Sequence, residues 1–213
     1  MEEIWRKWER HYNESGMAAG TICKDGIIDN EKFSGILFVL KEARLCKRGK
    51  EIKDIRDLYR LRPSGIGMTL AIWAYGIHNN WPPFEEVIDS RIELLHQQLT
   101  QTAVINLKKT VGERASDISV VNAYANHDRA LLREQIYMIR PRVIIACGVA
   151  DLLIWLLKVK VISERPKEQP IKMDNMWMVP SRSPTRNVVE DKRTYNMLRE
   201  MFKKIDDMKR IRI

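Results

Sequence analysis

The sequence predicts an α/β domain of three layers (α/β/α), in which helices cover a central, mainly parallel sheet of four strands. Four short apolar segments, 35–43, 103–109, 140–148 and 176–182, have the continuous pattern of strands covered on both faces, and each ends in polar residues. Segments with the helical spacing of apolar residues separate these strands, and this alternation is typical of a parallel sheet. A chain of 213 residues is long enough for one well-buried domain.

The pattern between the strands predicts where the helices lie. A first helix over 2–15 places Ile4, Trp5 and Trp8 on one face. Residues 24–30 form a turn with an extended flank. The segment Trp81-Pro-Pro-Phe84 breaks the helical pattern. Residues 110–126 are polar and turn-rich, so we expect a surface excursion near the site. Further helices are expected over 68–77, 85–99, 128–139, 151–158 and 190–209. We expect one domain over 1–213, composed of an N-terminal helical extension (1–23), a core (24–202) and a basic C-terminal tail (203–213).

The charge balance indicates a polyanionic partner. Lys and Arg number 37 against 28 Asp and Glu, which gives a net charge of +9 and a pI near 9.5. Such a field attracts polyanions, of which nucleic acid is the usual one. Residues 41–62 hold nine Lys and Arg against four acids, and the alternative is that this segment is only a solvated, charged loop.

Other features restrict the compartment and the cofactors. Cys23, Cys46 and Cys147 have no CxxC spacing, so neither a disulfide framework nor a metal or iron–sulfur site is expected, and no cofactor is predicted. The first ten residues are too charged for a secretory signal. The longest apolar stretch, 143–157, is too short to span a bilayer, so we expect no membrane contact and a cytoplasmic protein.

Four motifs follow the predicted strands in order. They are Lys41-Glu42-Ala43, an asparagine at 106, Pro-x-Val-Ile-Ile-x-x-Gly over 141–148, and Val179-Pro-Ser-Arg182. Their ordered set resembles the uracil-DNA glycosylase superfamily over about residues 24–202. The resemblance implies a parallel four-stranded sheet flanked by helices, and the excision of a flipped uracil or damaged base from DNA.

The resemblance also assigns roles at the centre of the site. Glu42 matches the first-motif position, where a carboxylate suits the positive charge that develops on the ribose as the N-glycosidic bond breaks. Asn106 matches the base-reading asparagine, whose amide presents a donor and an acceptor to a pyrimidine edge. Tyr59 is the candidate for stacking on the base. Alternatively, Glu42 pairs with a neighbouring basic group, Asn106 ends a strand, and aromatic residues in this interval pack in the core.

Basic residues beside these motifs are candidates for nucleic-acid contacts. The set also includes a serine and Arg186 from the loop 181–187, which the resemblance places near the minor groove. The candidates are Lys41, Arg44, Lys108, Lys109, Ser181, Arg182 and Arg186. The alternative is that these side chains lie on a solvated rim.

The fourth motif departs from the family pattern. The family shows His-Pro-Ser there, and the histidine stabilises the anionic base as it leaves. This chain has Val179, which donates no hydrogen bond, and the loss of one such donor lowers a rate by roughly 10²–10³. Arg182 is a possible substitute; His11, His78, His96 and His127 match no family motif. Three functions therefore stay open: a DNA glycosylase, a non-catalytic nucleic-acid or nucleobase binder on the same fold, and a binder of a nucleotide or another small ligand.

Overall fold

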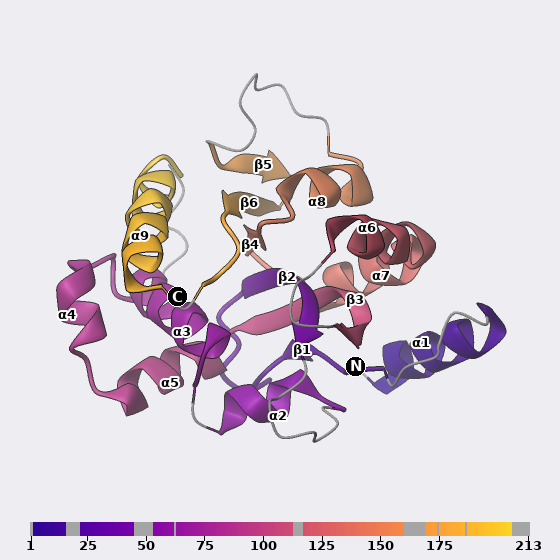
Figure 1. Ribbon diagram of the computed structural model, residues 1–213. Coiled ribbons are helices and arrows are strands. Elements are labelled where there is room, and N and C mark those ends of the chain that lie inside the picture. Colours follow the sequence, from indigo (N-terminus) through magenta and orange to yellow (C-terminus); the bar gives the residue numbers. More distant parts are fainter. Residues whose placement is uncertain are drawn as a thin grey trace.

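The computed structural model describes residues 2–15, 22–44, 53–61, 63–112, 117–159, 169–173, 175–185 and 187–205 (Figure 1). The strands in this part are β1 (Gly26–Ile27), β2 (Ile36–Arg44), β3 (Ala103–Gly112), β4 (Val143–Cys147), β5 (Ile171–Met173) and β6 (Met176–Ser181). The helices are α1 (Glu2–Ser15), α2 (Ile55–Arg60), α3 (Ile66–His78), α4 (Phe84–Ile88), α5 (Ile92–Thr100), α6 (Ile118–His127), α7 (Arg129–Ile139), α8 (Ala150–Leu157) and α9 (Val188–Lys203). None of these described helices is both long and apolar enough to cross a lipid bilayer.

The strands form one mixed sheet in the order β1-β3-β2-β4-β6-β5. The neighbours β3, β2, β4 and β6 are parallel, whereas β1 and β5 pair antiparallel at the two edges. The α/β class is therefore confirmed, but the expected number of four strands is wrong. The two edge strands contain two and three residues, which is too short for an alternating pattern to be visible in the sequence.

Helices cover both faces of the sheet, and a separate core lies under each layer (Figure 1). The strand β2 serves both cores, because Phe38 belongs to one core and Leu37 and Val39 to the other. The first core packs against α2, α3, α4, α5 and α9, and the second core packs against α1, α6, α7 and α8. The apolar runs 36–39 of β2 and 144–146 of β4 are 0% exposed because helices lie above and below them, as their unbroken apolar pattern predicts.

The helix α1 forms where it was expected. Ile4, Trp5, Trp8 and Tyr12 follow the helical spacing and are all buried in the second core. The two tryptophan rings lie 6.5 Å apart, centroid to centroid. The predicted N-terminal extension thus contributes a full face to the core.

Three segments differ from the sequence prediction. The polar stretch 110–126 is wrong as a surface excursion, because β3 continues to Gly112 and α6 begins at Ile118. Asp117 starts α6 by accepting a hydrogen bond from the Ser119 backbone N–H. Only Val121 and Ala125 of this helix are buried, whereas Ile118 and Val120 are exposed, so its apolar residues do not mark a single buried face. The helix expected over 85–99 is divided into α4 and α5, and α2 forms inside the basic segment.

Candidate ligand-binding site at the carboxyl edge of the sheet

A cleft of about 700 Å³ opens where β4 and β6 end. Its walls come from the turn after β4, from α8, from the end of β6, and from single residues or pairs of residues on α6 and α9. In parallel α/β sheets this carboxyl edge is the usual place for ligands. The lining includes Asn122, Gly148, Asp151, Trp155, Ser181 and Arg182.

The turn after β4 requires glycine. Gly148 has a φ of +70°, and a Cβ atom there would lie 2.2 Å from the Oγ of Ser183. The Gly148 backbone N–H donates a hydrogen bond of 2.8 Å to the Ser181 carbonyl. The turn after β4 and the loop after β6 are therefore held in contact, and they fix one end of the cleft.

An indole ring and a guanidinium group are the chemically distinctive parts of the cleft. Trp155 is 40% exposed, and the guanidinium of Arg129 stacks 4.1 Å from its ring centroid. The Arg182 side chain is 51% exposed and pairs with Glu190 at 3.2 Å. Arg129 lies outside the cleft lining, whereas Trp155 and Arg182 both belong to it, and a ring and a cation in one cleft suit a ligand that is both aromatic and anionic.

Glu42 and Lys108 form an ion pair at the end of the neighbouring strands β2 and β3. Glu42 Oε2 accepts a hydrogen bond of 2.7 Å from Lys108 Nζ, and the two residues are in register in the parallel ladder. The Glu42 side chain is 4% exposed and that of Lys108 is 11% exposed. Glycine at 112 makes room for this carboxylate, because a Cβ atom there would lie 2.0 Å from Glu42 Cδ. The pairing that the sequence left open as an alternative for Glu42 is thus present.

Asn106 lies on β3 two residues before Lys108 and is 2% exposed. Its backbone N–H donates to Asp25 Oδ2 at 2.8 Å, but its side-chain Nδ2 has no hydrogen-bond partner among the described residues. A buried amide without a partner costs about 1–3 kcal/mol, so such groups are usually satisfied by water or a ligand. The base-reading candidate therefore has an amide nitrogen that is free to donate.

Lys109 and Tyr59 lie in the interior, which does not fit the roles expected of them. The Lys109 ammonium is 0% exposed, lies 2.8 Å from both oxygens of Asp25, and is 5.3 Å from the ring centroid of Trp8. It is therefore not available to a phosphate. The ring of Tyr59 is buried in the first core against Gly67, and burial raises the pKa of its hydroxyl. It is therefore not exposed for stacking on a base.

The remaining predicted residues are scattered along the edge. Lys41 is half-buried near the end of β2, and Ser181 Oγ donates to the Arg182 carbonyl at 2.8 Å. The side chain of Arg44 and the whole of Arg186 lie outside the described residues. Val179 is 0% exposed in the first core, so its apolar side chain is a packing residue at the position of the family's histidine.

The cysteines of the described part are not reactive groups. Burial raises the pKa of Cys23 to about 12 and that of Cys147 to about 12, so both thiols stay protonated at neutral pH. This agrees with their being packing residues in the first core.

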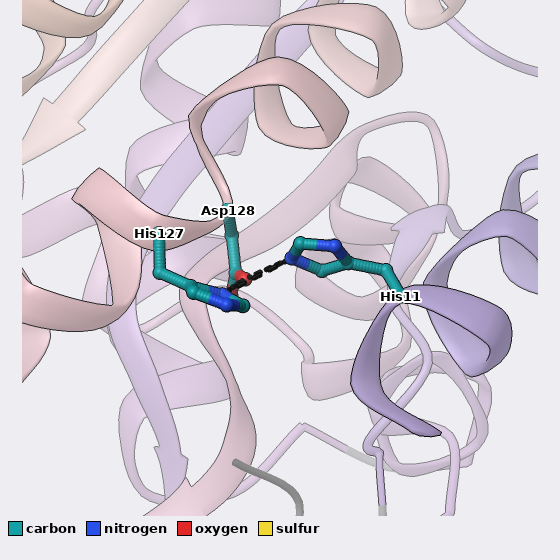
Figure 2. Close-up of side chains that lie close together, drawn as sticks. All are labelled: His11, His127 and Asp128. Carbon is teal, nitrogen blue, oxygen red and sulfur yellow. Dashed lines mark hydrogen bonds and ion pairs between the residues drawn. The ribbon is translucent and has the colours of Figure 1, made fainter. Parts of the chain in front are cut away.

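Two features of the molecule that bear on function, one in the cleft and one outside it, were missed from the sequence. Trp155 is an apolar residue on an apolar helix, and nothing in the sequence distinguishes its partly exposed ring from its buried neighbours. His11 and His127 are separated by more than a hundred residues, yet they meet at Asp128 (Figure 2). Only the packing of α1 against α7 brings them together.

Comparisons with known proteins give no family for the chain. Neither the protein-family models nor the curated proteins with which the chain was compared match it. The resemblance to uracil-DNA glycosylases therefore rests on the four motifs alone.

Proposed function

We propose that the protein binds nucleic acid, or a nucleobase-containing ligand, at the carboxyl edge of its sheet without cleaving it. The observation that carries this proposal is the cleft of about 700 Å³ in which the Trp155 ring and the Arg182 guanidinium line one cavity. Bases of any sequence stack on aromatic rings, and arginine binds phosphate through a planar set of donors. The net charge of +9 favours the approach of a polyanion.

Two further observations support binding over catalysis. Val179 offers no hydrogen bond to a departing base, and Glu42 is held in an ion pair with Lys108. The buried amide of Asn106 on β3 lies outside the cleft lining, and its Nδ2 has no hydrogen-bond partner among the described residues. This combination suits the recognition of a base more than the breaking of its glycosidic bond.

Fluorescence anisotropy with labelled single-stranded DNA, double-stranded DNA and RNA tests the proposal. We expect Trp155→Ala to weaken binding by about 1–3 kcal/mol, which is the usual contribution of one stacked base. Arg182→Ala should weaken binding and reduce the steepness of its salt dependence. Arg91→Ala is the matched control, because Arg91 is exposed and lies outside the cleft lining. Equal binding by the wild type and by the three variants Trp155→Ala, Arg182→Ala and Arg91→Ala would exclude the cleft as the binding site.

Base excision is the second candidate function. It is favoured by the placement of Glu42 and Asn106 on adjacent parallel strands, with the register partner of Glu42 only two residues after Asn106. We propose that, in this case, Asn106 reads the base and the Glu42 carboxylate stabilises the sugar cation. The assay uses oligonucleotides that carry uracil, hypoxanthine or oxidised bases, followed by alkali. Abasic sites that form with the wild type but not with Glu42→Gln would support excision. Equal activity of the two proteins would exclude Glu42 from the mechanism.

A further inference from the structure

A cluster of metal-ligating side chains lies outside the carboxyl-edge cleft. His11 comes from the last turns of α1, His127 ends α6, and Asp128 lies between α6 and α7. Figure 2 shows the two imidazole rings approaching the same carboxylate from different helices. His11 Nε2 lies 3.0 Å from Asp128 Oδ1, His127 Nδ1 lies 2.6 Å from the same oxygen, and the two nitrogens are 3.1 Å apart.

The three atoms are spaced as the ligands of one ion would be. Zinc binds imidazole nitrogen and carboxylate oxygen at about 2.0–2.2 Å, so two ligands of one ion lie about 3.0–3.5 Å apart. Two of the three separations lie in this range. The third requires His127 and Asp128 to move apart by roughly half an ångström on binding. Both imidazoles are partly exposed, at 31% and 28%, so this adjustment needs no change in the core.

The carboxylate of Asp128 lacks a fixed positive partner. Its side chain is 0% exposed, and its contacts in the described part of the chain are His11, His127 and the hydroxyl of Tyr12, which donates to Oδ2 at 2.7 Å. No lysine or arginine of the described residues forms an ion pair with it; the Lys109 ammonium, which Asp128 attracts from a distance, is bound to Asp25. Buried charges normally have a cationic partner or a metal. A divalent ion would supply that charge.

The position of Asp128 in the chain points to the same conclusion. It occupies the N-cap of α7, where an aspartate usually accepts a hydrogen bond from the first backbone N–H groups of the helix. Here the side chain makes no such bond and is directed to the histidines. The Tyr12 hydroxyl then orients the carboxylate from behind, as outer residues do at metal sites.

We propose that His11, His127 and Asp128 bind one divalent transition-metal ion of the zinc type. Two imidazole nitrogens and one carboxylate oxygen suit such ions and leave at least one coordination position open. The three residues line a cavity of about 410 Å³ together with Lys7, Arg10 and Glu14, so water or an anionic group can reach the open position. The ion would join α1 to the junction of α6 and α7.

The test uses the untagged full-length protein, dialysed against EDTA and then titrated with Zn²⁺ by calorimetry and with Co²⁺ by visible absorption. We expect one ion per chain, and a rise in the midpoint of thermal unfolding when Zn²⁺ is added. His11→Ala and His127→Ala should each weaken Zn²⁺ binding by more than about tenfold, and Tyr12→Phe by about 10–100-fold.

His96→Ala is the matched control and should bind Zn²⁺ as the wild type does, because His96 lies elsewhere and bonds to the Tyr59 carbonyl. If the alanine variants do not fold, Asp128→Asn keeps the shape of the side chain and should also lose the site. Wild-type protein that binds no Zn²⁺, or binding that is equal in the wild type, His11→Ala and His127→Ala, would overturn the proposal.

Discussion

Two consecutive lysines on β3 are each paired with a carboxylate, but in different environments. Lys109 and Asp25 are both 0% exposed, whereas Lys108 and Glu42 are 11% and 4% exposed at the edge of the sheet. Asp25 also accepts hydrogen bonds from the Asn106 backbone and from Gln135 Nε2. The Lys109 ammonium is further enclosed by the rings of Trp5 and Trp8.

We infer that the interior pair stabilises the fold and that the edge pair is placed where a ligand could reach it. The interior pair has every carboxylate contact filled, so it holds α1, β3 and α7 together and has no access to a ligand. In the edge pair, Lys108 is the hydrogen-bond partner of the Glu42 side chain among the described residues, and the pair borders the place where ligands bind to such sheets. Removing Lys108 and removing Lys109 should therefore have different effects on stability, although both are lysines at adjacent positions.

The largest expected effect comes from Lys109→Ala. It leaves the carboxylate of Asp25 buried without its cation, and breaking a buried pair in this way costs about 3–5 kcal/mol of unfolding free energy. Urea unfolding measures the loss. Lys32→Ala is the control, because its pair with Asp29 is exposed to solvent and should contribute little to stability. A similar small loss for both variants would contradict the structural role of Lys109.

Lys108→Ala should have a smaller effect, a loss of about 2 kcal/mol, because water can reach Glu42 from the edge once the lysine is removed. The same variant releases the Glu42 carboxylate from its ion pair. Comparing urea unfolding of Lys108→Ala with that of Lys109→Ala directly tests the proposed difference. A larger loss for Lys108→Ala would reverse our assignment of the two pairs.

Gly112→Ala should move Glu42 without removing a charge. The new Cβ atom would lie 2.0 Å from Glu42 Cδ, and the expected loss is about 1–2 kcal/mol because the carboxylate must leave its place. Gly67→Ala is the control, because its Cβ would meet the Tyr59 ring at a milder 3.1 Å. Thermal unfolding gives the comparison, and an unchanged midpoint for Gly112→Ala would mean that Glu42 does not lie against β3.

The smallest expected effect concerns His78, a half-buried imidazole without an acidic partner among the described residues. Burial lowers the pKa of His78 below its usual 6.5, against a raising effect of its hydrogen bond to Gln98. The unfolded chain therefore takes up a proton before the folded protein does, and stability falls as the pH drops from about 6.5 toward the lower pKa. Urea unfolding between pH 7 and pH 5 measures this slope. His78→Gln should reduce it, and an equal slope in both proteins would exclude His78 as the cause.

The sequence predicts the parts of the fold that depend on local pattern. The apolar runs around Phe38, Ile105 and Ile145 correspond to β2, β3 and β4, because a strand covered on both faces is apolar at every position. The helix α6 was missed because only Val121 and Ala125 anchor it in the core. Its other large apolar residues, Ile118 and Val120, are exposed, so the sequence shows no helical stripe over this segment.

The sites depend on contacts between distant residues, which the sequence does not encode locally. Adjacent strand residues point to opposite faces, so Lys108 and Lys109 cannot both reach one phosphate-binding edge. The sequence does not reveal that Asp25, 84 positions away, receives the second lysine. In the same way, nothing near His11 indicates that it meets His127 and Asp128.

The many contacts of Asp25 have a consequence for the exchange of amide hydrogens. The edge strand β1 is only two residues long, and such edges normally open readily to solvent. However, the Asn106 N–H is bonded to a carboxylate that also holds Lys109, so exposing that amide would require opening a buried ion pair. The Asn106 amide should therefore exchange with deuterium only through global unfolding, although it lies one strand from the edge of the sheet.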